Sequence, residues 1–129
     1  MDFASNRVIT DDVERLVSFY ERVTGLTAQW GSDQFAQLAM PVGTLAVAST
    51  RTMELFGASA AHAGDNRSVL IEFRVDDADG EAGKLRELGV ELVLEPTTQP
   101  WRNRSVLFRD PDGNLINFFT PVRAASPRR

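Results

Sequence analysis

Residues 101–121 read WRNRSVLFRDPDGNLINFFTP, and this stretch decides the fold. Two alternating apolar segments flank Pro111-Asp112-Gly113, and proline followed by glycine sets a tight hairpin between strands. The first half of the chain has the same arrangement of turn residues at Pro41-Val42-Gly43, again just before an apolar segment. The recurrence of this turn indicates that the chain uses one structural unit twice.

The rest of the pattern defines the repeated unit. Residues 11–23 and 77–88 have apolar side chains at helical spacing, acidic residues in the first turn and a glycine just beyond the end. One short strand precedes each helix and three follow it. We expect strands at residues 6–10, 26–30, 34–39, 44–49, 69–75, 90–94, 105–109 and 114–120. The sequence therefore predicts an α+β fold of two βαβββ modules, at about 5–50 and 68–121, with a linker at about 52–67.

Length and composition predict one domain, at residues 1–122, followed by a basic tail at 123–129. Three of the 14 basic residues lie in that tail, so residues 1–122 hold 11 basic and 18 acidic side chains, a net charge of −7. This acidic body disfavours nucleic-acid binding and favours a cationic ligand. With no secretion signal and no apolar run long enough for a membrane span, we expect a soluble, cytoplasmic protein.

Three segments together resemble the vicinal oxygen chelate superfamily of glyoxalases, bleomycin-resistance proteins and extradiol dioxygenases. They are VITDDVERLVSFYERVTGL at 8–26, VLIEFRVDD at 69–77 and the segment 101–121, and the resemblance covers nearly all of residues 5–121. It implies that mixed sheets form a cup around a small organic ligand, with the helices outside, usually in a homodimer. It also implies one divalent metal, held by side chains from the first and last strand of each module.

The residues at those four positions are not metal ligands. Counting from the helix starts and the turn prolines places Ser5, Val47, Leu70 and Asn117 there. A divalent cation needs carboxylate or imidazole donors, and the chain has no cysteine and a single histidine. We therefore predict a member with no metal and no cofactor. Glu72 would reach the metal position only if the pocket were displaced by a full pleat.

Strand alternation predicts the side chains that face the cup. We expect Leu45, Val47 and Ser49 on this side with Leu70, Glu72, Arg74, Leu115, Asn117 and Phe119, and Ile116 and Phe118 beneath the helices. The predicted ligand pocket comprises Arg7, Trp30, Phe35, Val47, Leu70, Glu72, Trp101, Arg104, Asn117 and Phe119. For each tryptophan, a place in the core or at a dimer interface is as well supported as a place in the pocket wall. Trp101 and Arg104 match a Trp-Gly-x-Arg pattern of the superfamily, although Arg102 replaces the glycine.

Two groups of polar residues allow alternative interpretations. Glu72 and Arg74 either belong to a structural charge network with Arg7 or Arg104, or Glu72 acts as a general base. His62 lies three residues after Ser59, which suggests a hydrolase pair, but the surrounding residues lack a nucleophile elbow and favour a solvated linker histidine.

These observations lead to three functional hypotheses. The first is a metal-free homodimer that sequesters a small cationic or aromatic compound, as antibiotic-binding relatives of bleomycin-resistance proteins do. The second is an enzyme of the same superfamily, a lyase, isomerase or ring-cleaving dioxygenase, that works through Glu72 or ordered solvent. The third is a pocket that only pairs with another protein.

Overall fold

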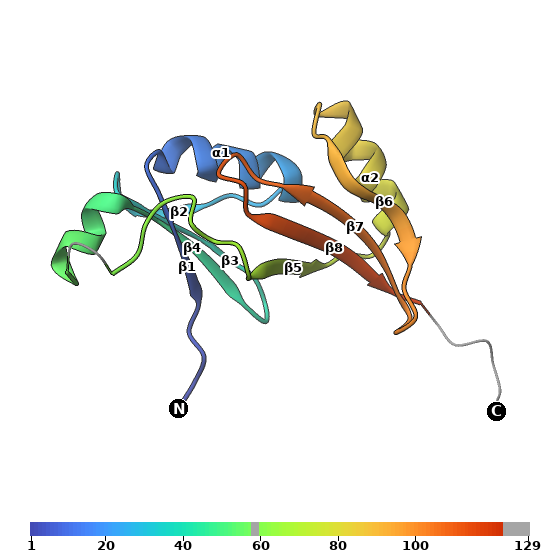
Figure 1. The fold of residues 1–129 in the computed structure, drawn as a ribbon, viewed down its shortest axis with the longest axis horizontal. Coiled ribbons are helices and arrows are strands. Elements are labelled where there is room, and N and C mark those ends of the chain that lie inside the picture. The colour runs from blue at the N-terminus through green and yellow to red at the C-terminus, as the bar shows by residue number, and fades with distance from the viewer. Residues whose placement is uncertain (58–59, 123–129) are drawn as a thin grey trace. The chain divides into compact units, whose positions relative to one another are not determined.

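A computed structural model describes residues 1–57 and 60–122 of the chain (Figure 1). It divides into two compact units, residues 1–67 with 111–113, and residues 68–110 with 114 onward. These units correspond to the two predicted modules, except that the turn at 111–113 groups with the first. The predicted basic tail at 123–129 lies outside the described residues.

Each module has the predicted βαβββ order. Module one comprises β1 (Asn6–Thr10), α1 (Val13–Thr24), β2 (Gln29–Ser32), β3 (Phe35–Ala39) and β4 (Thr44–Ser49), followed by the 3-10 helix η1 (Thr50–Leu55). Module two comprises β5 (Leu70–Arg74), α2 (Ala78–Glu87), β6 (Leu92–Thr98), β7 (Asn103–Arg109) and β8 (Leu115–Pro121). The sheets have the orders β1-β4-β3-β2 and β5-β8-β7-β6, each with one parallel pair, so the fold prediction is confirmed.

Both helices begin at aspartate caps. The side chain of Asp12 accepts a hydrogen bond from the Arg15 amide at 3.1 Å, and Asp77 does the same for the Gly80 amide at 3.1 Å. These bonds satisfy backbone donors that have no partner within the helix. Gly25 ends α1 with a φ of 76°, a left-handed conformation that glycine adopts without a steric penalty.

One face of each sheet packs against the helix of its module, and we call it the closed face. The opposite face is the open face. In module one the closed face carries Leu38, Leu45 and Val47, all 4% exposed or less, and it packs against the buried apolar side of α1. In module two it carries Ile116 and Phe118, at 0% and 1% exposure, as predicted. The opposite, open faces hold the polar side chains of the candidate site.

The predicted facing of β4 was wrong by one residue. Val47 pairs with Val8, whereas Ala46 pairs with Arg7 on the open face. The cause is turn length. The Met40 amide bonds to the Gly43 carbonyl around two residues, but the Asp110 amide bonds to the Asn114 carbonyl around three. Because side chains alternate along a strand, counting equal distances from the two prolines reaches opposite faces.

Several strand boundaries also differ from expectation. β2 begins at Gln29 rather than at 26, and η1 occupies the start of the predicted linker. β6 and β7 extend into the residues between the strands predicted at 90–94 and 105–109, and only a short turn separates them. Pro96 is compatible with β6 because this strand lies at the edge of its sheet, where a missing N–H does not break an inner ladder.

The turn between β6 and β7 holds a strained residue. The Gln99 amide donates to the Asn103 carbonyl at 2.7 Å, and the Arg102 amide donates to the Gln99 carbonyl at 2.9 Å. Arg102 has a φ of 68°, the only positive value outside glycine in the described part of the chain. This is the left-handed region that favours glycine, the residue that the superfamily pattern has at this place. For a residue with a Cβ, this conformation costs about 1–2 kcal/mol.

We predict that Arg102→Gly stabilises the protein relative to Arg102→Ala by about 1 kcal/mol, because only glycine adopts this conformation without strain. Both variants remove the same side-chain contacts, so the alanine variant is the matched control. Urea unfolding at equilibrium measures the difference. Equal stabilities of the two variants would show that the turn relaxes when the arginine is removed.

Candidate functional site

The open face of module two is built from three facing pairs on the parallel strands β5 and β8. The pairs are Leu70 with Leu115, Glu72 with Asn117, and Arg74 with Phe119. From β7, Leu107 pairs with Asn117 and Ser105 with Phe119, on the same face. Along the strands, the open face is therefore apolar at one end and polar at the centre. At the other end it has an arginine beside an aromatic ring.

The polar centre is a hydrogen-bonded pair. Asn117 Nδ2 donates to Glu72 Oε2 at 2.9 Å. Asn117 is 6% exposed, and its Oδ1 is buried without a hydrogen-bond partner among the described residues. A buried acceptor without a partner costs about 1–3 kcal/mol, so this oxygen is a place where a donor from outside the chain would be favourable. Glu72 is exposed, and the hydrogen bond from Asn117 reaches only one of its two carboxylate oxygens.

Arg74 lies two residues after Glu72 on the same face and is exposed. Within the residues that the structure covers, neither side chain forms an ion pair. The predicted network that joined these two residues to Arg7 or Arg104 is therefore not formed. Glu72 instead has the amide of Asn117 as its partner, and the guanidinium of Arg74 is available to bind a ligand.

Arg104 has a structural role on the other face of the sheet. Its Nε and Nη2 donate to the carboxylate of Asp79 on α2 at 2.7 and 2.9 Å, and its Nη1 donates to Thr98 Oγ1 at 3.1 Å. The hydrogen bond from Arg104 lowers the pKa of Asp79 below its usual value, and Asp79 raises the pKa of Arg104. We therefore exclude Arg104 from the candidate site.

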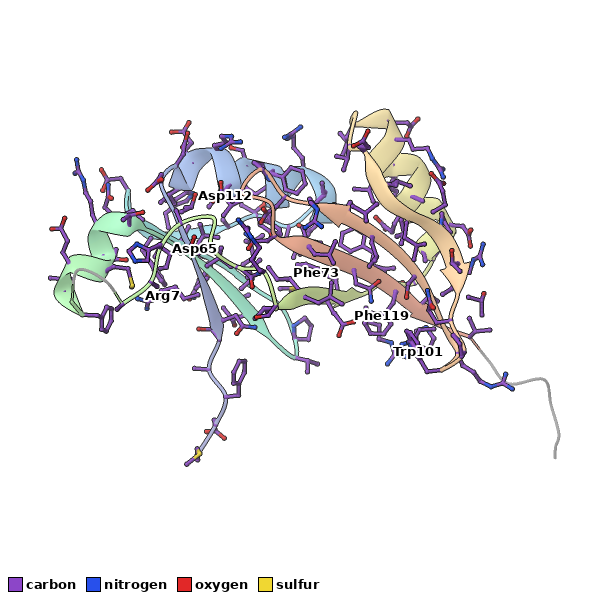
Figure 2. All side chains as sticks on the ribbon, viewed as in Figure 1. Arg7, Asp65, Phe73, Trp101, Asp112 and Phe119 are labelled. Carbon is purple, nitrogen blue, oxygen red and sulfur yellow. The ribbon has the colours of Figure 1, made fainter. Side chains whose placement is uncertain are left out.

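Trp101 is 67% exposed in the turn after β6. Asn103, at the start of β7, pairs with Pro121, which places this turn at the end of the sheet where Phe119 lies. Figure 2 labels both aromatic residues at this end. The expected role of Trp101 as an aromatic wall stays a prediction.

The predicted site residues of module one divide between its two faces. Arg7 lies over the ring of Phe35, with 5.0 Å from the guanidinium carbon to the ring centroid, and both belong to the open face. Trp30 pairs with Ala36, which in turn pairs with Val47, so these residues belong to the closed face. Trp30 is 47% exposed on the edge strand β2.

The residues at the expected metal positions do not fit a metal. The register makes Ala46, opposite Arg7, the counterpart of Asn117 opposite Glu72, so Ala46 replaces Val47 in this set. Module one then offers the hydroxyl of Ser5, and module two offers the amide of Asn117 beside the apolar Leu70. One neutral oxygen per module does not match the carboxylate and imidazole donors that divalent cations take. Residues 1–57 and 60–122 contain no group of three or more His, Cys, Asp or Glu side chains placed to hold an ion.

The other sequence candidates lie away from these faces. His62 is exposed in the segment between η1 and β5. Ser59, its proposed hydrolase partner, lies outside the described residues. Within the described part of the chain, no helix combines the length and the apolar character needed to cross a membrane.

Two contacts of this region were missed by sequence reasoning. The bond between Glu72 and Asn117 joins residues 45 positions apart, and that between Arg104 and Asp79 joins residues 25 positions apart. The first could have been found by aligning β5 with β8, since both positions were already assigned to one face. The second carries no sequence signal because neither the tilt of α2 nor the extent of β7 is encoded in local spacing.

Comparisons with known proteins agree with this architecture. The sequence profile of the Glyoxalase/Bleomycin resistance protein/Dioxygenase superfamily matches residues 3–118. The uncharacterized protein YraH of Bacillus subtilis is 30% identical over 119 residues, which cover 88% of this chain and 93% of that protein. The putative glyoxylase CFP32 of Mycobacterium tuberculosis is 25% identical over 126 residues, 91% of this chain, and the chain spans only 43% of its length.

Solved structures share the fold at low identity. A glyoxalase/bleomycin resistance protein/dioxygenase family enzyme from Burkholderia phytofirmans has a TM-score of 0.83 at 18% identity, and covers 95% of this chain and 100% of its own. A glyoxalase/bleomycin resistance protein/dioxygenase from Nocardioides has a TM-score of 0.79 at 22% identity, and the match covers 100% of this chain and 89% of that chain.

We predict that Asp79→Asn lowers stability at pH 7 and that its difference from the wild type shrinks in acid. The folded pKa of Asp79 lies below its unfolded value, so its contribution is complete above about pH 4 and is lost as the pH falls through the folded pKa. Urea unfolding at pH 7 and pH 3 tests this, with Arg104→Gln as the reciprocal variant. A difference that is the same at both pH values would contradict the assigned role of the pair.

We also predict that the purified protein contains less than about one tenth of a divalent metal ion per chain, because the donors at the expected positions are too few and too weak. Elemental analysis by mass spectrometry, on protein prepared without chelators or affinity metals, measures the content. Addition of EDTA is expected to leave the unfolding temperature unchanged. Stoichiometric Ni, Zn, Mn or Fe would contradict the assignment.

Proposed function

Because the chain belongs to the Glyoxalase/Bleomycin resistance protein/Dioxygenase superfamily, we propose that it binds a small aromatic molecule, without a metal ion, on the open face of module two. The observation that carries the proposal is the hydrogen-bonded pair of Glu72 and Asn117 on an otherwise largely apolar surface. Apolar walls with a few placed polar groups are the usual composition of small-molecule sites. Sequestration of such a compound needs only affinity.

The charge on this face refines the expected ligand. The net charge of −7 on residues 1–122 argued for a cationic guest, but Glu72 is the only acidic side chain on β5 and β8. Arg74 follows it on the same face and balances its charge locally. The overall acidity of the body therefore gives no reason to prefer a purely cationic compound, and the aromatic part of the expectation is the part that we retain.

Catalysis is the second candidate function, and one observation favours it. The amide of Asn117 holds the exposed carboxylate of Glu72 from one side, as the positioning of a general base requires. Conversion of a bound compound into product would establish this activity. The homodimer implied by the superfamily resemblance remains part of the proposal.

We predict that aromatic compounds raise the unfolding midpoint of the protein and that Phe119→Leu weakens their binding about fivefold. The variant keeps an apolar side chain but removes the flat ring, and ring contacts are worth about 0.5–1.5 kcal/mol. A ligand at a concentration 100 times its Kd stabilises by about 2.7 kcal/mol, which a thermal-shift screen detects readily.

Phe56→Leu is the matched control, because Phe56 is 68% exposed in the segment after η1. It should leave affinity unchanged. If no aromatic compound in a broad panel shifts the midpoint, the proposed binding function is wrong. If Phe119→Leu and Phe56→Leu bind as the wild type does, the ligand is held elsewhere.

A further inference from the structure

We propose that the ligand of module two is an aromatic zwitterion with an amine at one end of the ring and a carboxylate at the other. This inference rests on the proposed function and specifies the chemical class of its ligand. It follows from three features of the open face, namely the acceptors at Glu72 and Asn117, the available guanidinium of Arg74, and the apolar surface beside them.

The polar centre, formed by Glu72 and Asn117, is suited to a ligand group that donates more than one hydrogen bond. Glu72 Oε2 is already bonded to Asn117 Nδ2, so the remaining acceptors are the other carboxylate oxygen and the unpartnered Oδ1 of Asn117. A hydroxyl group has one hydrogen to donate, whereas a protonated amine has three. A protonated amine therefore has enough hydrogens for both acceptors, and its positive charge complements the carboxylate of Glu72.

Arg74, the next residue on the same face of β5, is suited to binding an anion. Arg74 is exposed, and it forms no ion pair with Glu72 or with any other residue that the structure covers. A guanidinium group binds a carboxylate through two parallel hydrogen bonds. The Cα atoms of two residues on the same face of a strand lie about 6.6 Å apart, and we choose a ligand whose charges have a similar separation.

The surface around these groups is suited to a flat ring. Phe119 pairs with Arg74, and Leu107 pairs with Asn117 from the neighbouring strand. Both side chains are partly exposed, so they offer apolar area that a ligand would cover. A para-substituted benzene ring holds an aminomethyl group and a carboxylate at its two opposite ends. The compound 4-(aminomethyl)benzoate has these properties and is the probe that we choose.

Calorimetric titration of the full chain with four matched probes tests the inference. The probes are 4-(aminomethyl)benzoate, benzylamine without the carboxylate, benzoate without the amine, and benzyl alcohol without either charge. We expect removal of either charged group to weaken binding to the wild type about tenfold, as for hydrogen bonds to charged partners.

Two variants assign each loss to a residue. In Arg74→Gln, 4-(aminomethyl)benzoate and benzylamine should bind within about twofold of each other, because the partner of the carboxylate is gone. In Glu72→Gln, 4-(aminomethyl)benzoate and benzoate should become similar in the same way. Both residues are exposed, so neither change disturbs the core. Arg51→Gln removes an exposed arginine of η1 and controls for net charge, and it should keep the tenfold preferences.

The outcomes separate the two proposals. If the wild type binds all four probes equally, or if Arg74→Gln keeps the preference for the carboxylate, the zwitterion inference is overturned while aromatic binding stands. If none of the probes binds although other aromatic compounds stabilise the protein, the inference is again overturned alone. If no aromatic compound of any kind binds, the proposed function fails and the inference fails with it.

Discussion

The parallel pairing of the first and last strand within each module is the constraint on which the rest of the structure depends. In module two this pairing sets Glu72 opposite Asn117 and Phe73 opposite Phe118. The first pair then lies on the open face and the second on the closed face. A slip of one residue would bury a carboxylate and expose a phenylalanine, so burial of the core also determines the chemistry of the open face.

Much of the fold could be predicted because its signals are local. Helix periodicity, the aspartate caps and the repeated turn led to two βαβββ modules, and alternation led to the burial of Ile116 and Phe118. The facing of β4 could not be obtained from the same alignment because the turn at Pro41 is one residue shorter than the turn at Pro111. The repeated turn residues therefore predicted where the strands lie but not their register.

The candidate site was predictable as a set of positions but not as a set of interactions. Glu72, Asn117 and Phe119 were expected on one face and lie on one face. Arg104 was expected beside them, but it pairs with Thr120 on the other face of the sheet, where it bonds to Asp79. The net charge describes the chain as a whole, and most acidic side chains belong to helices, caps and turns. The few charges on the open face are what a bound molecule would meet.

The central claim is that the open face of module two binds a small organic ligand without a metal. The most direct test is to follow the side-chain amide signals of Asn117 by NMR while 4-(aminomethyl)benzoate is added to metal-free protein. The account predicts a saturable shift of these signals, together with shifts at Glu72 and Phe119, and none at Arg104. Saturable binding that leaves the Asn117 amide unmoved, or that requires an added divalent metal, would contradict it.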